Sequence, residues 1–348
     1  MQTKDLSGYR ALGSSLEPLQ ADLGIDRTPT DHFFVCSVAS PPPVDRASWR
    51  MRIEGDAAAT PTEIDWQTLS QLPRHDIDAW LECAGNMRRL YELVDGHPAG
   101  DADTDTQWML NAMGSGRWSG PRLRDVLALA EPNESLEWVA TTGLDAENGE
   151  GEAPAMCMPA SKAVSDETIV ALEMNGAPLE PEHGSPARLV VPGWIGAYWV
   201  KWPARIVLSQ NWVRSWRADV YYQRRTPDGD ALGPATTHPV KSSLALPWKA
   251  ELLAGRTELR GYARAAGQPI NNVDYSIDGE PWQPAELVGP NGDWTWSPFR
   301  FEWRATPGAH VIRTRATAAD GSTQPAHVPY HPNTVLWNAI IPHPVTVI

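Results

Sequence analysis

The order of hydrophobic and polar positions divides the chain into two parts with different patterns. From about residue 30 to residue 222, short runs of β-branched residues alternate with segments of helical periodicity. From about residue 241 onward, strand-like runs follow one another directly and are separated by turns rich in Pro and Gly. Residues 223–240 contain the turn signals Asp228-Gly229 and Gly233-Pro234, so we predict that they form a linker between the two parts.

The first part is predicted to contain both strands and helices. Thr60-Pro61-Thr62-Glu63 is a capping box with Pro at the first helical position, and it predicts a helix that ends at Leu72. A second helix is predicted after Ser119 and Pro121, because apolar residues then recur with helical spacing. Glu147–Glu152 is predicted to be a solvated acidic loop. The predicted strands are His32–Ala39, Trp49–Gly55, Ala187–Val191 and Ala204–Leu208.

The second part is predicted to be an immunoglobulin-like sandwich, because regular short strands extend over about 100 residues. Asp278-Gly279 and Asp320-Gly321 are hairpin signals. The predicted strands are Thr257–Ala263, Val273–Ile277, Trp294–Trp303 and His310–Ala316. Five tryptophans are expected to fill the gap between the two sheets: Trp282, Trp294, Trp296, Trp303 and Trp337.

Charge and composition exclude several classes of protein. With 29 Lys and Arg against 43 Asp and Glu, the chain of 348 residues has a net charge of −14, which argues against binding to nucleic acid or to an anionic membrane. No apolar run approaches the ~20 residues of a membrane span. The first 20 residues show no signal peptide, which predicts a cytoplasmic protein, or a periplasmic one if the N-terminus was trimmed. The three cysteines are too few for a disulfide scaffold.

One segment of the first part, Trp80–Arg89, combines a cysteine with nearby positive charge. Arg88 and Arg89 follow Cys83 closely, and guanidinium groups favour the thiolate form that binds metals or attacks electrophiles. A buried structural cysteine beside two surface arginines fits the same residues equally well. The chain has no CxxC, HxH or HExxH motif. A metal carried by an organic dithiolene cofactor would need only one protein sulfur.

The segment Leu81–Asn86 resembles the molybdenum-ligand segment of the sulfite oxidase family of mononuclear molybdopterin enzymes. The resemblance extends over about residues 30 to 348. It implies an α+β fold, with a molybdopterin-binding catalytic domain (residues 1–235) followed by an immunoglobulin-like dimerisation domain (residues 241–348). Further matches, in the order of the family, are Gly116–Leu123, Ala171–Gly176, Glu182–Arg188, Val191–Ala197, Val200–Trp202, Val273–Trp282, Gln324-Pro325 and Trp337-Asn338.

The resemblance also implies roles for individual residues. Cys83 would bind molybdenum through its thiolate, and Arg88 would lie beside the metal and attract an oxyanion. Tyr221 matches an active-site tyrosine of the family, although the neighbouring Tyr222 could take that role. Four residues match positions that hold the pterin and its phosphate: Arg117, His183, Arg188 and Lys201.

Differences from the family pattern concern the substrate. The segment "FFVRNH" of sulfite-oxidising members reads Phe33–Val38 here, with Cys36 in place of the substrate-binding arginine and Val38 in place of the histidine. Where many members end in "HRV", this chain has His343-Pro344-Val345. A charge-assisted hydrogen bond contributes roughly 1.5–3 kcal/mol, so losing one weakens binding by a factor of about 10 to 150. We therefore predict that sulfite is not the efficient substrate.

These residues predict an oxidoreductase that uses the molybdenum–molybdopterin cofactor for a two-electron oxygen-atom transfer. The expected substrate is a small oxyanion or an organic sulfur–oxygen compound. The resemblance implies no heme in this chain, a separate electron-transfer protein such as a cytochrome c, and a homodimer. The alternative within enzymes is a molybdenum-dependent reductase of sulfoxide or nitrate type. An alternative of another class is a non-enzymatic β-sandwich assembly protein with a degenerate first domain.

Overall fold

The computed structural model describes residues 4–38, 40–103, 105–145 and 155–348, so the predicted loop Glu147–Glu152 lies outside the described residues. The described chain is mostly β, and the helices of its α+β fold are few and short. None of these helices is long and apolar enough to cross a membrane. The α-helices are α1 (Trp66–Gln71), α2 (Arg89–Leu93), α3 (Leu123–Leu127) and α4 (Ala160–Ala163). The 3-10 turns are η1 (Leu6–Gly8), η2 (Thr30–His32), η3 (Ala128–Ala130), η4 (Pro181–His183) and η5 (Gly196–Tyr198), and η6 (Arg217–Tyr221) is a turn of π-helix.

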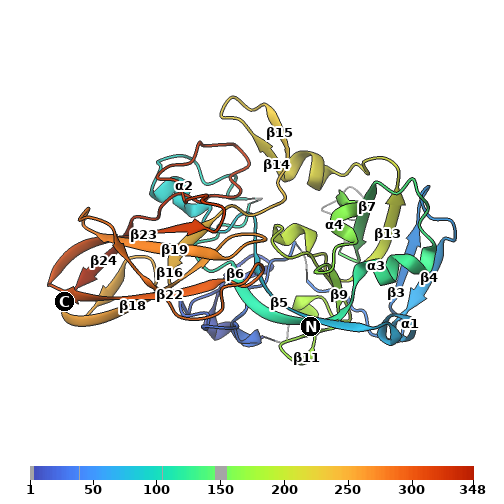
Figure 1. Ribbon diagram of the computed structural model, residues 1–348, viewed down its shortest axis with the longest axis horizontal. Coiled ribbons are helices and arrows are strands. Elements are labelled where there is room, and N and C mark those ends of the chain that lie inside the picture. Colours follow the sequence, from blue (N-terminus) through green and yellow to red (C-terminus); the bar gives the residue numbers. More distant parts are fainter. Residues whose placement is uncertain (1–3, 39, 104, 146–154) are drawn as a thin grey trace.

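The first part, on the right of Figure 1, is built on two main sheets. In the five-stranded sheet, the β3–β13 pair is parallel and the other pairs are antiparallel. Its strands, in spatial order, are β4 (Thr62–Asp65), β3 (Arg50–Glu54), β13 (Pro203–Ser209), β7 (Trp138–Gly143) and β8 (Ala155–Pro159). The four-stranded sheet has the order β11 (Ala177–Pro178), β10 (Glu173–Met174), β6 (Met113–Pro121) and β5 (Arg74–Glu82). Three two-stranded pairs are β1 (Tyr9–Leu12) with β2 (Ser15–Pro18), β9 (Ile169–Ala171) with β12 (Arg188–Val190), and β14 (Gln223–Arg225) with β15 (Ala231–Pro234).

The second part, on the left of Figure 1, consists of two sheets that share one apolar core. Leu259 and Phe299 come from one sheet, Val273 and Ile312 from the other, and all four are buried in the same cluster. The first sheet has the order β16 (Lys241–Leu244), β18 (Gly255–Arg264), β22 (Ser297–Ala305) and β21 (Glu286–Leu287). The second has the order β17 (Ala250–Leu252), β24 (His343–Val347), β23 (Gly308–Ala318), β19 (Ile270–Ile277) and β20 (Gln283–Pro284).

Most predicted strands are present with small shifts at their ends, but the first predicted helix begins later than expected. Thr62–Asp65 pairs with β3, so the proposed capping box lies in a strand. The helix α1 starts at Trp66 instead, because the side chain of Asp65 accepts a hydrogen bond from the Thr68 amide and caps it. The second predicted helix is confirmed as α3 followed by η3. The four apolar residues that recur with helical spacing are buried: Leu123, Val126, Leu127 and Ala130. Ser119 and Pro121, however, belong to strand β6.

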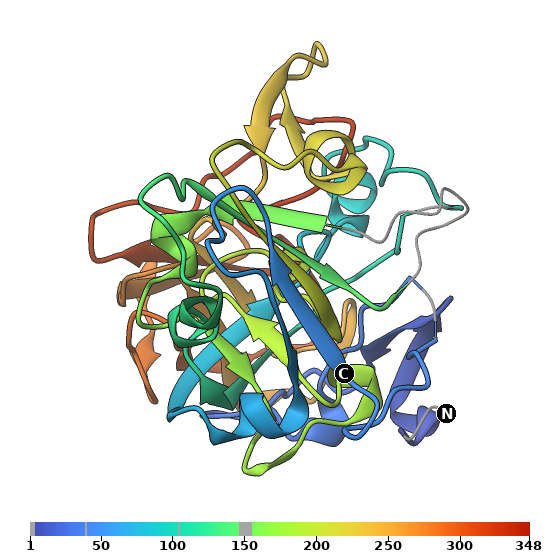
Figure 2. The ribbon, with the colours of Figure 1, turned by 90° about the vertical axis from the view of Figure 1, so that its right-hand side faces the viewer.

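Two other predictions are wrong. The described residues of the predicted strand, 32–38, do not form a strand: Thr30–His32 forms η2, and among these described residues only Val35 makes a bridge, to Leu16. Residues 223–240 are not a plain linker, because they contain the β14–β15 hairpin, which projects from the body in Figures 1 and 2. The residues after this hairpin return to the interior, since Ala235 and His238 are buried.

The two parts are joined by apolar contacts that use several of the tryptophans. Trp296 of the second part packs in one buried cluster with Trp80 and Leu23 of the first. Trp337 packs in another cluster with Leu90 and Tyr91, near α2. Of the five tryptophans expected between the sheets of the sandwich, only Trp303 packs against that core. Trp296 and Trp337 therefore stabilise the contact between the two parts, which meet in a packed apolar interface.

Candidate active site

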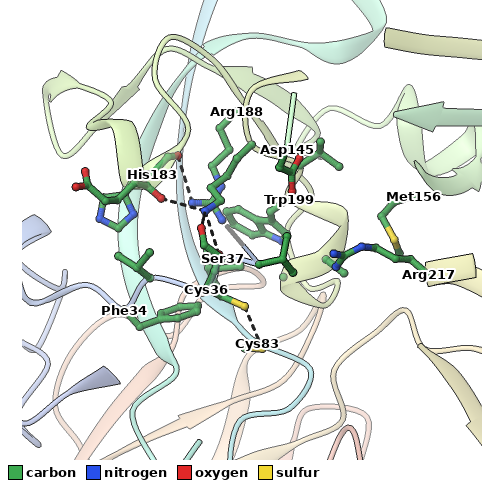
Figure 3. A pocket seen from close by; sticks show the side chains of 18 of the residues that line it. Phe34, Cys36, Ser37, Cys83, Asp145, Met156, His183, Arg188, Trp199 and Arg217 are labelled. Atoms are coloured by element: carbon green, nitrogen blue, oxygen red, sulfur yellow. Dashed lines mark hydrogen bonds between the residues drawn. The ribbon is translucent and has the colours of Figure 1, made fainter. Parts of the chain in front are cut away.

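A hollow in the first part brings together residues that are far apart in the sequence. It contains about 800 Å³ of space free of atoms, including solvent at its mouth. Figure 3 shows two cysteines at its floor and several cationic side chains around it. Its lining comprises Phe34, Val35, Cys36, Ser37, Val38, Leu81, Cys83, Asp145, Met156, Glu182, His183, Arg188, Gly196, Ala197, Trp199, Val200, Lys201, Arg217 and Tyr222, and we call it the active-site hollow.

Cys83 reaches the floor of the hollow from the end of β5. Its amide donates to the carbonyl of Ala112, which continues the antiparallel β5–β6 pairing by one residue. The chain then turns, and the amide of Asn86 donates to the Cys83 carbonyl. Gly196 allows η5 to approach closely, because a Cβ there would lie 3.1 Å from the carbonyl oxygen of Glu82. The backbone that carries the Cys83 sulfur is thus fixed by hydrogen bonds on both sides and by close packing against η5.

Cys36 faces the same floor from the segment that follows η2. Its sulfur lies 3.9 Å from the sulfur of Cys83, and its side chain is exposed to the hollow. The hydrogen bond with Cys36 and burial together raise the pKa of the Cys83 thiol well above its ordinary value. When this pair holds one negative charge, we therefore place it on Cys36, which lies near the positive charges of Lys201 and Arg217.

Three basic side chains line the hollow close to one another: His183, Arg188 and Lys201. Lys201 is held by hydrogen bonds to the carbonyls of Cys36 (3.0 Å) and Glu182 (3.2 Å) and to the hydroxyl of Ser37. Burial lowers the pKa of Lys201 to about 8 and that of Arg188 to about 9. Burial also holds the pKa of His183 well below its ordinary value.

This basic side of the hollow has unused hydrogen-bonding capacity. Among the residues that the structure describes, the Nε atom of Arg188 and the Nε2 atom of His183 are buried and have no hydrogen-bond partner. The only acceptor found for Arg188 among these residues is the His183 carbonyl, at 3.4 Å. Gly184, at φ +107°, gives the turn between them, and a Cβ there would lie 3.2 Å from the Cβ atoms of Arg188 and Lys201. The arrangement suits an anion such as a phosphate.

Arg88 is buried behind the floor and is already paired. Its Nη1 atom lies 3.3 Å from the carboxylate of Asp105, and it also donates to the carbonyls of Thr106 and Thr334. The hydroxyl of Tyr221 donates to the same carboxylate at 2.6 Å. Neither Arg88 nor Tyr221 is among the lining residues of the hollow, whereas Tyr222 is. The structure therefore groups Arg88 and Tyr221 around Asp105, beside the hollow.

Arg117 is the predicted cofactor-binding residue that the structure does not bring to the hollow. Its side chain is half-exposed on β6 and forms an ion pair with Asp78 at 2.8 Å. Arg27 binds the same carboxylate. Asp78 lies directly opposite Arg117 in the β5–β6 pairing, so this contact is a cross-strand pair on the sheet surface. Its predicted role in cofactor binding stays a prediction.

Arg217 lines the hollow but was not among the predicted site residues, and Tyr222, the predicted alternative to Tyr221, lines it as well. Both belong to the segment of η6, in which sequence reasoning singled out Tyr221 instead. The local sequence around Arg217 carries no motif that marks it as a lining residue. In Figure 3 Arg217 lies beside Met156, on the opposite side of the hollow from His183.

Comparisons with known proteins identify the family. Residues 38–216 match the family model described as an oxidoreductase molybdopterin binding domain. The sulfite oxidase of Gallus gallus is 31% identical over 331 residues, which cover 89% of this chain and 70% of that protein. The chain belongs to the sulfite oxidase family of molybdopterin oxidoreductases. The resemblance and the molybdenum–molybdopterin cofactor predicted from the sequence are thereby confirmed.

Other proteins that are similar to this chain differ in length and in name. The mitochondrial sulfite oxidase of Mus musculus is 30% identical over 89% of this chain, which spans 58% of that protein. A nitrate reductase of Ulva prolifera is 27% identical over 89% of this chain, which spans 39% of that protein. The sulfane dehydrogenase SoxCD from Paracoccus pantotrophus superposes with a TM-score of 0.84 over 97% of this chain and 86% of that chain, at 24% identity. This last likeness shows that the fold is the sulfite-oxidase type.

The hollow fits the cofactor of this family. A molybdenum held by a pterin dithiolene needs one protein sulfur, and Cys83 presents one at the floor. The pterin and its phosphate need hydrogen-bond donors and positive charge, and the unpartnered buried atoms of Arg188 and His183 provide donors beside Lys201. The donor set and its burial thus match both ends of the cofactor.

Proposed function

We propose that this chain catalyses a two-electron oxygen-atom transfer on a sulfur–oxygen compound that carries less charge than sulfite. The observation that carries the proposal is the floor of the active-site hollow, where Cys36 stands beside Cys83. In the sulfite-oxidising members that the sequence resembles, this position is an arginine. When bound, the cofactor would supply the redox chemistry and exchange the oxygen atom.

The residues of the chain would bind the cofactor and exclude water. Cys83 would hold the metal, and Arg188, His183 and Lys201 would hold the pterin and its phosphate. An anion bound there would raise the pKa values of Lys201 and Arg188 back toward their ordinary values, since an opposite charge nearby favours the charged form of a basic group. Trp199 and Phe34, both buried, would limit the access of water from the sides.

Two features of the hollow argue against a dianionic substrate. The arginine expected at position 36 is replaced by a thiol, and the guanidinium of Arg88 is paired with Asp105. Arg217 supplies one cation on the far side of the hollow, which suffices to orient a polar oxygen without matching two negative charges. Apolar side chains, among them Phe34 and Met156, make up much of the remaining wall. Sulfoxides and organic sulfur compounds fit such a lining.

A metal and pterin assay combined with steady-state turnover tests this proposal. Protein expressed with molybdenum should contain about one molybdenum and one pterin per chain. Cys83→Ser should lose the metal–thiolate absorption and all turnover. Turnover should be faster with sulfoxides or organic sulfur compounds than with sulfite. Absence of molybdenum and pterin would overturn the proposal that the chain is a molybdenum enzyme. Efficient oxidation of sulfite by the unmodified protein would overturn the proposed substrate class.

A reductase of sulfoxide or nitrate type is the second candidate. The similarity to a nitrate reductase over 89% of this chain favours it, because the family includes members named for reduction. Turnover with a reduced viologen dye and either nitrate or a sulfoxide distinguishes the two directions. Faster turnover with the dye than with an oxidising acceptor would support the reductase.

We further propose that the second part is an immunoglobulin-like domain that forms a homodimer, and that a separate protein such as a cytochrome c exchanges electrons with the enzyme. The two sheets around one core support the first proposal. Light scattering of the purified protein tests the dimer: a mass of about 76 kDa is expected from two chains of 38.2 kDa. A single-chain mass at micromolar concentration would contradict it.

A further inference from the structure

The residue before Cys83 is anchored in the interface between the two parts. Glu82 is the last residue of β5, and its side chain does not line the active-site hollow. Its carboxylate accepts from Lys241 Nζ at 2.8 Å and from Arg264 at 2.6 Å and 2.9 Å, so that Arg264 binds it with two nitrogens. All three side chains are at most 1% exposed.

Two further residues hold the same segment. Asn86 donates to the Glu82 carboxylate at 2.9 Å, and its own oxygen accepts from the Ala112 amide. The Nε2 atom of His238 lies 3.1 Å from the carbonyl oxygen of Glu82. Burial lowers the pKa of His238 to about 4, so its ring is neutral at pH 7 and can donate to that carbonyl. The side chain of Glu82, its carbonyl group and the turn that follows it are therefore all fixed by hydrogen bonds.

The two cations that bind Glu82 come from neighbouring strands of one sheet in the second part. Lys241 on β16 and Arg264 on β18 are directly opposite each other in the antiparallel pairing of these strands. Their side chains extend together into the first part and meet the single carboxylate there. The second part thus presents a preformed pair of donors to the residue next to Cys83.

We propose that Lys241 and Arg264 are positioning residues, which set the direction of the Cys83 side chain by fixing Glu82 from the opposite face of the strand. Successive side chains of a strand point to opposite faces, so a fixed Glu82 side chain also fixes the Cα–Cβ direction of Cys83. The second part then serves the active site itself, in addition to any role in assembly.

The chemistry of the cluster supports this role over a purely structural one. Burying charged groups is costly, and apolar residues of similar size often stabilise an interface equally well or better. A carboxylate held by four hydrogen-bonding nitrogens in a fixed geometry provides orientation that apolar packing lacks. In metal sites, residues that orient a ligand typically change metal affinity by about 10- to 100-fold when mutated.

Arg264→Lys is the central test, because it keeps the charge and loses the two-nitrogen contact. In the loaded protein we expect molybdenum to be released about tenfold faster and the metal–thiolate absorption band to shift. In protein prepared without cofactor, we expect Cys83 to be alkylated several-fold faster, measured by mass spectrometry against the buried Cys157 as internal reference. Glu82→Gln should change all three readouts in the same direction.

Tyr262→Phe is the matched control. Tyr262 lies two residues before Arg264 on β18, and its hydroxyl joins the two parts through Asp22 and the amide of Leu23, both at 2.8 Å. This variant should lower the melting temperature without changing the Cys83 readouts. Equal effects of Tyr262→Phe and Arg264→Lys would overturn the proposal, as would unchanged Cys83 readouts in Arg264→Lys. The alkylation needs no cofactor, so its result stands whether or not the proposed function holds.

Discussion

The sulfur atom of Cys36 lies 3.9 Å from the sulfur atom of Cys83 at the floor of the active-site hollow. Cys36, which the resemblance places where sulfite-oxidising members have an arginine, therefore contacts the proposed metal ligand itself. Cys36 is exposed to the hollow, whereas Cys83 and Cys157 are buried. The three thiols should consequently differ in reactivity.

In protein prepared without cofactor, we expect Cys36 to be alkylated first. The hydrogen bond from Cys83 lowers the pKa of Cys36 to about 6, so most of it is thiolate at pH 7, while burial raises the pKa of Cys157 to about 11. Iodoacetamide at pH 7 followed by peptide mass spectrometry should show labelling of Cys36 at least about 100-fold faster than labelling of Cys157. Similar rates for the two would contradict the arrangement of the pair.

Cys36→Arg should convert the hollow toward oxyanion binding. An added guanidinium would supply one charge-assisted hydrogen bond, worth about 1.5–3 kcal/mol, or about 10- to 150-fold in kcat/KM for sulfite. Cys36→Ser is the matched control, because it removes the thiol without adding charge. Steady-state kinetics with sulfite should be measured for the unmodified protein, Cys36→Arg and Cys36→Ser. Only Cys36→Arg should have a higher kcat/KM than the unmodified protein. A gain in the serine variant as well would show that loss of the thiol is the cause.

Asp105→Asn should release Arg88 from its ion pair. The amide would keep a hydrogen bond to Tyr221 or to Arg88 but would leave the buried guanidinium without a counter-charge. We expect tighter binding of sulfate as an inhibitor together with a loss of stability of about 3 kcal/mol, as for a broken buried ion pair. Inhibition constants and urea unfolding measure the two effects. Unchanged sulfate binding would mean that Arg88 cannot reach an anion even when it is unpaired.

Glu82→Gln should be among the most destabilising single changes in the chain. It leaves Lys241 and Arg264 buried without a counter-ion, and breaking such a pair costs about 3–5 kcal/mol. Adding Lys241→Met removes one of the two uncompensated charges, so the double variant should lose less than the sum of the two single losses, by about 0.5–3 kcal/mol. Urea unfolding of the four proteins gives this coupling. Simple additivity would contradict direct contact between the two side chains.

Several of the basic residues singled out in the sequence do meet on the wall of the hollow, and their role in cofactor binding stays a prediction. His183 ends η4, Gly184 caps it and Arg188 begins β12, so one short segment brings the two basic side chains to the hollow. Cys83 likewise sits in a single recognisable segment. Lys201 reaches the same wall because it pairs with Arg188 in a β-bridge. Hydrophobic periodicity does not predict this pairing, and Lys201 was singled out from the resemblance to the family.

What the sequence does not predict is set by long-range pairing. The ion pair of Arg88 joins it to Asp105, which lies in a segment without a recognisable pattern. The capping box at Thr60–Glu63 has the right residues for a helix, but hydrogen bonds to β3 outweigh that local preference. Lys241 and Arg264 look like ordinary strand residues, and only the docking of two sheets shows that both reach Glu82. In each case the deciding partner is distant in sequence.

The stability of the cofactor-free protein should depend on pH through Lys201. Burial lowers its pKa from 10.5 to about 8 in the folded state, so between pH 8 and 10.5 the unfolded chain binds more protons than the folded chain. The contribution of Lys201 to the free energy of unfolding should therefore rise with pH in this window, by about 1.4 kcal/mol per pH unit at most, and should be flat below pH 8. Lys201→Met removes this group, so its unfolding free energy should rise less steeply between pH 8 and 9.5 than that of the unmodified protein. Urea unfolding at half-unit steps measures both slopes, and identical slopes would show that Lys201 keeps an ordinary pKa in the folded protein.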